Sequence, residues 1–179
     1  MCQLKKCLWV FDFDDTLVKT SSRVHVIRDE EKFDMTTSEY VQHVKQHNEI
    51  FDYSDFQHLI DPQPIEQVCR LLRDAIERSI HLPKLHNVIV LTARGFANPV
   101  HEFLTSIKCS GIEVVALVSV SHEEKAHWIN KRLEGVQIDE IHFFDDSLKN
   151  IEAVQVLVRS INVHTYHVST AGIHHSSSS

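Results

Sequence analysis

The stretch "LWVFDFDDT", residues 8–16, places three carboxylates directly after a run of apolar side chains. A short, continuous apolar run is typical of a strand buried on both faces of a parallel sheet, and it predicts a strand over residues 7–13. Asp12 and Asp14 are two positions apart, so an extended chain directs both to the same side. Two carboxylates on one side repel each other unless a cation or a shared proton intervenes. The stretch therefore predicts a buried strand with a charged site at its carboxyl end.

Much of the remaining chain alternates between strand-like and helix-like segments. Strands are predicted over residues 87–92, 113–118, 139–144 and 160–168, and helices over residues 64–80, 97–108, 122–134 and 147–157. This alternation predicts an α/β fold, a three-layer α/β/α Rossmann-like sandwich with a mainly parallel sheet and right-handed crossovers. In such sheets the functional site lies beyond the carboxyl ends of the strands.

The segment between the first strand and the helix at residue 64 departs from this alternation. Residues 24–34 predict a small β-hairpin, and Thr36 with Glu39 forms a capping-box pattern that predicts a helix over residues 37–47. The periodicity of residues 49–60 favours neither helix nor strand. We expect residues 18–62 to form a small cap insertion in a single domain of residues 1–168. The low-complexity tail, residues 169–179, is expected to be disordered.

Composition narrows the classes of protein. The 179 residues, 42% of them hydrophobic, suit one domain. With 18 Lys and Arg against 25 Asp and Glu, the net charge of -7 does not favour long-range attraction to nucleic acid or to an anionic membrane. Scattered cysteines, no long apolar stretch and no signal-peptide pattern predict a soluble cytoplasmic protein. The 14 histidines show no zinc-ligand spacing, so we expect them to be solvated or hydrogen-bonded.

Polar residues recur at the ends of the other predicted strands. One strand ends in Thr92, with Arg94 two positions on, and another ends in Asp145 and Asp146. Lys125 lies near the start of the helix that follows the strand at 113–118. One acid at one strand end is usually a helix cap or a turn residue. Because several such positions converge on one edge of a parallel sheet, we expect a functional site there.

The residue types at this edge indicate a metal ion and a phosphate. Carboxylates without Cys or His nearby suit Mg²⁺, which takes carboxylates, a carbonyl, waters and substrate phosphate oxygens. Thr92 and Lys125 supply groups that complement a phosphate, Lys125 as a point charge on its oxygens. Ser121 and Glu124 form a second capping-box pattern that predicts the start of the helix carrying Lys125.

These motifs together resemble the haloacid dehalogenase superfamily of phosphohydrolases. Its first motif, hhhhDxDxT, is matched by residues 9–16, its second by the strand that ends in Thr92, its third by Lys125 and its fourth by residues 142–146. All four occur in the family's order and span residues 8–150. Residues 10–60 also resemble a group of small phosphatase-like proteins, many from phages and bacteria. In that group a β-hairpin and a "YDFSEF"-like stretch follow the first motif, and this chain has "FDYSDF" at residues 51–56.

The resemblance implies a mechanism. Asp12 would be the nucleophile that forms an aspartyl-phosphate, and Asp14 the general acid that protonates the leaving group and then the base that activates water. Thr92 and Lys125 would bind the phosphoryl group. Mg²⁺ would be held by Asp12, by the backbone carbonyl of Asp14, by Asp146, and by Asp145 directly or through water.

Three further residues have less defined roles in the resemblance. Thr16 is expected to fix the turn rather than to take part in the chemistry. Arg94 would bind a second anionic group of the substrate or lie on the surface. Asp15 stands where many relatives have Gly, so it either turns away from the site or limits how anionic a substrate is accepted.

The expected partner is a phosphorylated small molecule or a nucleotide. A small cap would leave the site open enough for a nucleic-acid end, and a 3′-phosphatase is the first alternative, although the charge and the lack of a basic stripe do not favour it. A catalytically silent binding or regulatory protein is the second alternative. Dehalogenase chemistry is disfavoured because dehalogenases lack the second Asp, here Asp14.

Overall fold

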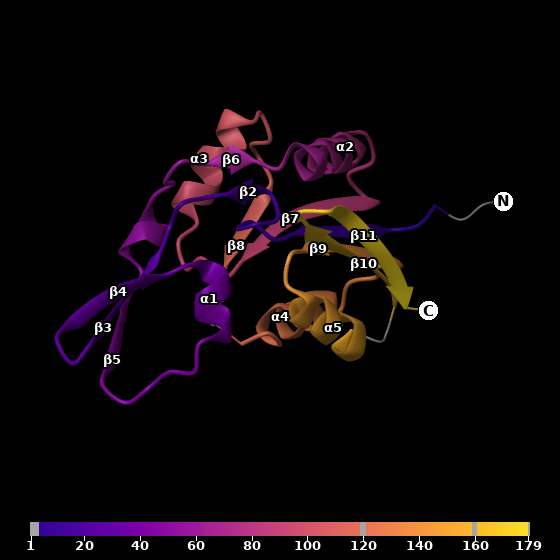
Figure 1. The fold of residues 1–179 in the computed structure, drawn as a ribbon. Helices are drawn as coiled ribbons and strands as arrows, with labels where there is room; N and C mark the ends of the chain where they lie inside the picture. Colours follow the sequence, from indigo (N-terminus) through magenta and orange to yellow (C-terminus); the bar gives the residue numbers. More distant parts are fainter. Residues whose placement is uncertain (1–3, 119–120, 159–160, 179) are drawn as a thin grey trace.

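The computed structural model describes residues 4–118, 121–158 and 161–178 (Figure 1). Its central feature is a six-stranded sheet with the strand order β11-β10-β9-β1-β7-β8. Neighbouring strands are parallel, except that β11 runs antiparallel to β10. The strands are β1 (Cys7–Phe11), β7 (His86–Thr92), β8 (Glu113–Ala116), β9 (Glu140–Asp145), β10 (Asn162–Ser169) and β11 (Gly172–Ser178). The prediction of a mixed α/β fold with a mainly parallel sheet is confirmed.

Strand β1 lies inside the sheet, between β7 and β9, because its side chains are apolar on both faces. Phe11 and its neighbours on one face pack against the apolar sides of α2 (Glu66–His81) and α3 (Asn98–Ser106). Leu8 and Val10 on the other face belong to a core formed with α4 (Glu124–Leu133) and α5 (Leu148–Leu157). Figure 1 shows α2 and α3 above the sheet and α4 and α5 below it.

The C-terminal tail forms a strand. Residues expected to be disordered, from 169 onward, include the end of β10, a turn and β11, which pairs with β10 from Ser169 to Val163. The prediction of disorder is wrong over the described part of the tail, because β10 offers an edge whose backbone groups a following strand satisfies. Side chains reinforce the pairing, since Gln155 Nε2 donates to Ser176 Oγ at 2.8 Å and lies within 2.7 Å of Thr165 Oγ1.

The insertion after β1 forms two small antiparallel sheets. One joins β2 (Val18–Lys19) to β6 (Gln63–Pro64), and the other has the order β4-β3-β5, with β3 (Val24–Arg28), β4 (Glu31–Met35) and β5 (Glu49–Asp52). The predicted hairpin is confirmed. Its turn residues Asp29 and Glu30 both have positive φ, 46° and 73°, as a tight two-residue hairpin turn requires.

Helix α1 (Thr37–Gln42) begins at the predicted capping box, in which Thr36 and Glu39 bond each other's backbone N–H groups. The helix is shorter than expected, since it ends at Gln42 rather than at residue 47. The cause lies in β5, where the buried Glu49 carboxylate accepts hydrogen bonds from His43 and from the Gln46 N–H, both at 2.7 Å. These bonds hold the chain after Gln42 in an extended path. Residues 54–57, undecided from the sequence, form a 3₁₀ helix, η1 (Ser54–Gln57).

Within the described residues, no helix is both long enough and apolar enough to cross a membrane.

Candidate active site

The acidic loop after β1 is shaped by an anchoring side chain between its first two acids. Phe13 is fully buried and packs edge-to-face on Phe103 of α3, with ring centroids 5.4 Å apart. Its carbonyl accepts the N–H groups of Leu17 and Val18, which folds the chain into a tight turn. Asp12 continues the sheet, since its N–H donates to Phe144 O at 2.9 Å. The flanking acids are therefore held at the carboxyl edge of the sheet.

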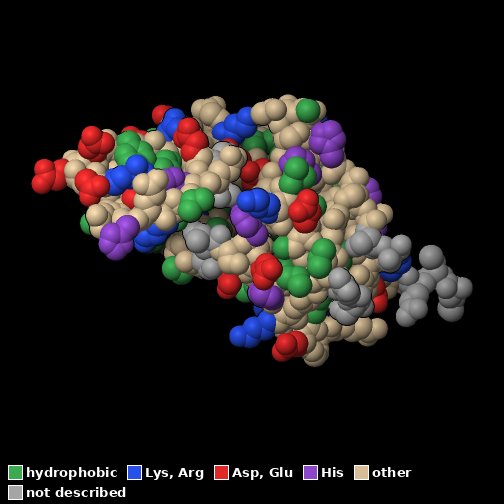
Figure 2. Space-filling model, turned by 60° about the horizontal axis from the view of Figure 1, so that its bottom comes forward, with side chains coloured by type: hydrophobic (Ala, Val, Ile, Leu, Met, Phe, Trp, Pro, Cys, Tyr) green, Lys and Arg blue, Asp and Glu red, His purple; other side chains and the backbone are tan. Residues whose placement is uncertain are grey.

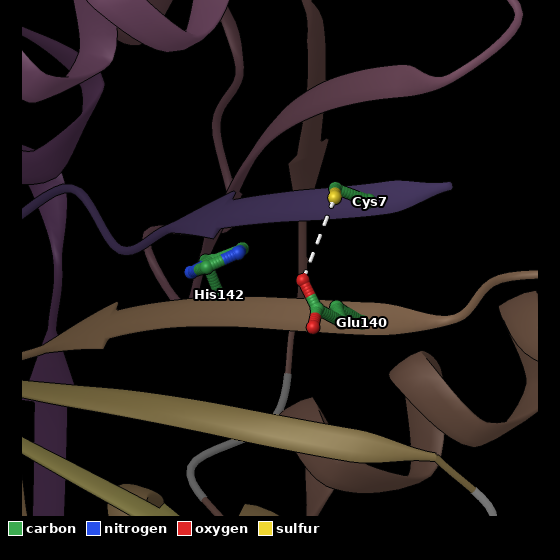
Figure 3. Close-up of side chains that lie close together, drawn as sticks. All are labelled: Cys7, Glu140 and His142. Carbon is green, nitrogen blue, oxygen red and sulfur yellow. Dashed lines mark hydrogen bonds between the residues drawn. The ribbon is translucent and has the colours of Figure 1, made fainter. Parts of the chain in front are cut away.

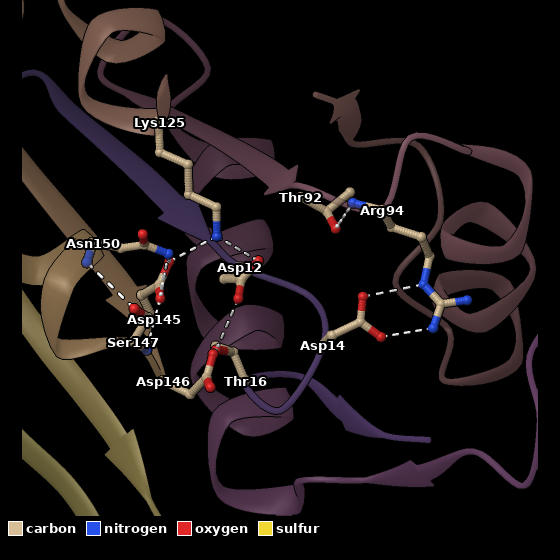
Figure 4. Close-up of polar contacts among 10 residues, drawn as sticks. All are labelled: Asp12, Asp14, Thr16, Thr92, Arg94, Lys125, Asp145, Asp146, Ser147 and Asn150. Carbon is tan, nitrogen blue, oxygen red and sulfur yellow. Dashed lines mark hydrogen bonds and ion pairs between the residues drawn. The ribbon is translucent and has the colours of Figure 1, made fainter. Parts of the chain in front are cut away.

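Asp12 and Asp145 share one buried cation, Lys125. The Lys125 Nζ lies 2.7 Å from Asp12 Oδ1 and 2.7 Å from Asp145 Oδ2 (Figure 4). Burial by itself lowers the pKa of Lys125, but the two carboxylates outweigh it and the net pKa is raised, so the side chain is an ammonium. Asp12 directly follows β1, Asp145 ends β9 and Lys125 lies in α4, and these elements meet at this edge, as the sequence predicted.

The predicted capping box before Lys125 is wrong. Helix α4 begins at Glu124, and the side chain of its N-cap residue, Glu123, makes no capping hydrogen bond. The Ser121 Oγ accepts the N–H of Glu123, at 3.4 Å, rather than that of Glu124. Ser121 lies too early, and its backbone carbonyl accepts the Glu124 N–H at 3.1 Å in a turn that precedes the helix. Lys125 therefore stands in the first turn of α4, where its side chain extends over the strand ends.

A third carboxylate, Asp146, completes an acidic group. Asp12, Asp145 and Asp146 each present an oxygen within 4.8 Å of the others. Burial raises the pKa of Asp12 well above its ordinary range, Lys125 opposes this, and the other two acids raise it further. Burial and the charge of Asp145 raise the pKa of Asp146 to about 7. Because Lys125 compensates at most one negative charge, such a group favours an additional cation, and its oxygen ligands suit Mg²⁺.

Asp145 and Asp146 differ in how their oxygens are engaged. Asp145 Oδ1 accepts hydrogen bonds from the Ser147 N–H at 2.9 Å and from Asn150 Nδ2 at 3.0 Å, while Oδ2 faces Lys125 and also Asn150. Asp146 Oδ1 lies 3.4 Å from Thr16 Oγ1, which is also 3.4 Å from Asp12 Oδ2. Asp145 is therefore fitted to orient Lys125, and Asp146 is the better placed of the two for a metal. The sequence placed Asn150 after the fourth motif but did not reveal that it orients Asp145.

Asp14 faces away from Asp12 and is paired with Arg94 (Figure 4). Arg94 Nε donates to Asp14 Oδ2 at 3.1 Å and Nη2 donates to Oδ1 at 2.6 Å, a bidentate pair. Arg94 Nη1 donates to the backbone carbonyls of Phe56 and His58 at 3.2 and 2.7 Å. The carboxylate of Asp14 is thus outside the acidic group, and the prediction that Asp12 and Asp14 face the same side is wrong, because Arg94 holds the Asp14 carboxylate away from Asp12.

The structure corrects the expectation that Arg94 could lie on the surface. Its side chain is fully buried, so it is not a surface residue. Its guanidinium is bound to Asp14 and to the backbone carbonyls of Phe56 and His58. Arg94 also lines the pocket, so binding of a second anionic group of the substrate stays a prediction. Arg94 joins the acidic loop to the insertion. Its own N–H donates to Thr92 Oγ1 at 3.1 Å, and Thr92 lies at the end of β7 as predicted.

Asp15 turns toward the insertion. Its φ of 57° is in the left-handed region, which Gly adopts most readily and which Asp and Asn enter more often than other side chains. Thr37 Oγ1 at the start of α1 donates to Asp15 Oδ2 at 3.0 Å. Burial raises the pKa of Asp15, and the Thr37 hydrogen bond partly offsets this. Asp15 thus links the loop to the insertion.

A pocket of about 880 Å³ opens over these residues, between the insertion and the strand ends. Asp12, Thr92, Lys125 and Asp146 line it from the sheet. The aromatic side chains that line the rest of it are Tyr40, Tyr53, Phe56 and Phe96. Its volume lies in the range of sites for small molecules, which are mostly apolar with a few convergent polar groups.

Comparison with known proteins yields no match to this chain among family models, curated proteins or solved structures.

Proposed function

We propose that the chain is a Mg²⁺-dependent phosphomonoester hydrolase of the haloacid dehalogenase type, built as a three-layer α/β/α sandwich with a small cap. The observation that carries this proposal is the convergence of Asp12, Lys125 and Asp146 on one pocket that also contains Thr92. A buried carboxylate beside a buried ammonium and further acids is a costly arrangement, and such groups cluster at functional sites.

Asp12 is the proposed nucleophile. One of its oxygens attacks the substrate phosphorus, so that a P–O bond to Asp12 forms while the bond to the leaving oxygen breaks. Lys125 holds Asp12 Oδ1 in place at 2.7 Å. The remaining oxygen is directed toward Thr16 and Asp146, on the side where an incoming phosphoryl group and a cation would lie.

Asp12 and Asp146 are the proposed metal ligands, together with the Asp14 carbonyl. Asp145 is proposed to orient Lys125 through their ion pair. A bound Mg²⁺ supplies charge that offsets the repulsion between nucleophile and phosphoryl oxygens. Lys125 and the Thr92 hydroxyl would stabilise the equatorial oxygens of the transferred phosphoryl group, Lys125 with a positive charge and Thr92 with a hydrogen bond.

Asp14 is the proposed general acid and base. It gives its proton to the leaving oxygen, and in the second step it takes a proton from the water that attacks the phospho-aspartate, which releases inorganic phosphate and restores Asp12. In the geometry described, its carboxyl group is bound to Arg94 rather than directed at Asp12. The proposal therefore requires the Asp14 side chain to rotate from Arg94 toward the substrate during the cycle.

The substrate class is a phosphomonoester with a sizeable leaving group, such as a nucleotide. A pocket of about 880 Å³ far exceeds a phosphate ion, and its aromatic lining suits a flat or apolar group. A nucleic-acid end remains the alternative with less support. On the face drawn in Figure 2, acidic and basic side chains are interspersed rather than gathered into a basic stripe.

The test is an assay of the purified chain on p-nitrophenyl phosphate, nucleotides and 3′-phosphorylated oligonucleotides, with Mg²⁺ and with a chelator. We expect turnover only with Mg²⁺, and none in Asp12→Asn, because an amide oxygen is too weak a nucleophile to attack phosphorus. The phosphoryl group should be trapped on Asp12 and found there by mass spectrometry.

Asp74→Asn is the matched control, since Asp74 is exposed on α2, away from the pocket, and its activity should equal that of the wild type. Activity in the chelator, or in Asp12→Asn, would refute the mechanism. Absence of turnover on every substrate would favour a silent binding protein, and turnover of oligonucleotide ends alone would favour the 3′-phosphatase.

A further inference from the structure

A second group of potential metal ligands lies at the opposite, amino-terminal edge of the sheet. Cys7 begins β1 and Glu140 begins β9, and the two are directly paired in the parallel register. His142 is two positions beyond Glu140 and therefore lies on the same face of β9. The Cys7 sulfur, a carboxylate oxygen of Glu140 and a ring nitrogen of His142 all lie within 4.8 Å of one another (Figure 3).

The contacts around this group are those expected of a ligand set. Cys7 Sγ is 3.9 Å from Glu140 Oε2. His142 Nδ1 is 3.0 Å from the Tyr166 hydroxyl, and its ring stacks on Trp9 at a centroid distance of 3.9 Å. Metal-binding histidines characteristically engage their second nitrogen in such a hydrogen bond, which fixes the ring and leaves the other nitrogen for the metal. The stacked Trp9 restrains the ring further.

A nearby histidine offers an additional donor. His164 on β10 is directly paired with His142, and its Nε2 is 3.9 Å from Glu140 Oε1. Lys5, which is exposed, is ion-paired with the same carboxylate oxygen. The Glu140 carboxylate therefore binds a cationic side chain in this structure. Because Lys5 is exposed, its side chain can move into solvent when a metal ion binds Glu140.

We propose that Cys7, Glu140 and His142 bind a divalent transition metal ion of the zinc class, with His164 or water as the fourth ligand. Thiolate, imidazole and carboxylate together suit Zn²⁺ or Co²⁺ and not Mg²⁺, which prefers oxygen ligands alone. Zn²⁺ binds sulfur at about 2.3 Å and nitrogen or oxygen at about 2.0–2.2 Å, so the three donors, which lie within 4.8 Å of one another, have to move closer together when the ion binds. Binding releases the Cys7 thiol proton and displaces Lys5.

This site is separate from the pocket in location and chemistry. It joins the beginnings of β1 and β9, whereas the pocket lies beyond their carboxyl ends. The expected role is structural, since an ion that binds the folded chain and not the unfolded chain stabilises it in proportion to its occupancy.

The experiment is a titration of the full chain with Co²⁺, read by absorption. A cobalt–thiolate bond produces charge-transfer absorption in the near ultraviolet, which neither the oxygen ligands of the pocket nor a histidine pair produces. We expect this absorption in the wild type, its loss in Cys7→Ser, and much weaker binding in Glu140→Gln and His142→Gln. Tyr166→Phe should weaken binding about 10–100-fold through the lost support of His142. Lys5→Met should strengthen Co²⁺ binding, because the ion no longer has to displace the Lys5 ammonium from Glu140.

Cys109→Ser is the matched control and should keep the absorption. Zn²⁺ should displace Co²⁺ and raise the melting temperature of the wild type. It should not raise the melting temperature of Glu140→Gln. Glu140 is partly exposed, so this variant is expected to fold, and circular dichroism verifies that it does. No thiolate absorption in the wild type, or absorption that survives in Cys7→Ser, would overturn the proposal.

Discussion

At the scale of single residues, the three acids of the opening stretch have three different environments. Asp12 faces Lys125, Asp14 is bound to Arg94, and Asp15 adopts a left-handed conformation with its side chain on Thr37. Adjacent positions in one short loop differ this much because Phe13 is fixed in the core and the turn after it reverses the chain. In the proposed mechanism the three acids are therefore not interchangeable.

The acid–base role of Asp14 is tested by Asp14→Asn on two substrates. With an alkyl phosphate, whose leaving group needs a proton, we expect turnover to fall about 10²–10⁴-fold. With p-nitrophenyl phosphate the first step needs no proton, so a burst of p-nitrophenolate equal to the enzyme concentration should precede slow hydrolysis of the aspartyl-phosphate. Stopped-flow absorbance measures both phases. An equal loss on both substrates without a burst would contradict the role.

The ion pair of Arg94 makes a prediction about stability. Arg94→Met leaves Asp14 without its partner and the carbonyls of Phe56 and His58 without their donor. Removing one member of a buried ion pair costs about 3–5 kcal/mol, so unfolding in urea should shift to clearly lower concentration. The control is Arg132→Met, whose pair with Glu113 is exposed and contributes about 0–1 kcal/mol. Equal effects of the two substitutions would show that Arg94 does not join loop and insertion.

At the scale of secondary-structure elements, the insertion is held together by polar side chains as much as by its small core. Val24, Val26, Met35 and Phe56 form that core. His25 on β3 bonds Asp34 on β4 at 2.7 Å and Asp55 in η1 at 3.0 Å. These contacts place η1 where its Phe56 carbonyl accepts a hydrogen bond from Arg94, so the elements that line the pocket depend on one another.

His25 makes the stability of the insertion depend on pH. Hydrogen bonds to Asp34 and then to Asp55 raise the pKa of His25 from 6.5 to about 9. A raised histidine pKa means that the stabilisation is complete below pH 6.5 and is lost as the pH rises through about 9. We expect the melting temperature to fall over this interval in the wild type and to fall less in His25→Gln.

The His25 ring signals should titrate in the same interval by nuclear magnetic resonance. His81→Gln is the control, because His81 is exposed near the end of α2, and it should keep the wild-type pH profile. A midpoint near the ordinary histidine value would rule out the two contacts in solution.

At the scale of the whole molecule, the proposed active site and the proposed metal site lie at opposite ends of the parallel strands. Parallel strands bring their carboxyl ends together, which gathers the acids and Lys125 under the insertion, and they bring their amino ends together, which gathers Cys7, Glu140 and His142. The antiparallel strand β11 covers the edge of β10. The described tail is therefore part of the sheet.

Removal of residues 172–179 tests this role of β11. The truncated chain loses the β10 pairing and the contacts of Ser176 with Thr165 and Gln155, and it exposes a strand edge. We expect a lower melting temperature, by about 2–4 °C for each kcal/mol lost, and more aggregation in light scattering. A truncated chain with unchanged melting temperature and unchanged scattering would show that β11 does not contribute to the fold.

Features that depend on local pattern could be predicted from the amino-acid sequence. The apolar run before Asp12, the helical periodicity of residues 64–80 and the Thr36–Glu39 capping box each act through near neighbours, so strand, helix and cap were predicted. The convergence of Asp12, Lys125 and Asp145 was also predictable, because the carboxyl ends of parallel strands share one edge.

Features that depend on partners far along the chain became visible only in the folded molecule. Arg94 and Asp14 are 80 positions apart in the sequence, and Cys7 and Glu140 are 133 positions apart. Local spacing therefore predicted neither the buried ion pair nor the second group of metal ligands. The same holds for the early end of α1, which follows from the hydrogen-bonding needs of a buried Glu49. Residue type and periodicity predict whether a segment is a helix or a strand. The partner of a buried charge depends on tertiary packing, because a buried charge is costly unless it is paired, and its partner can come from any part of the chain.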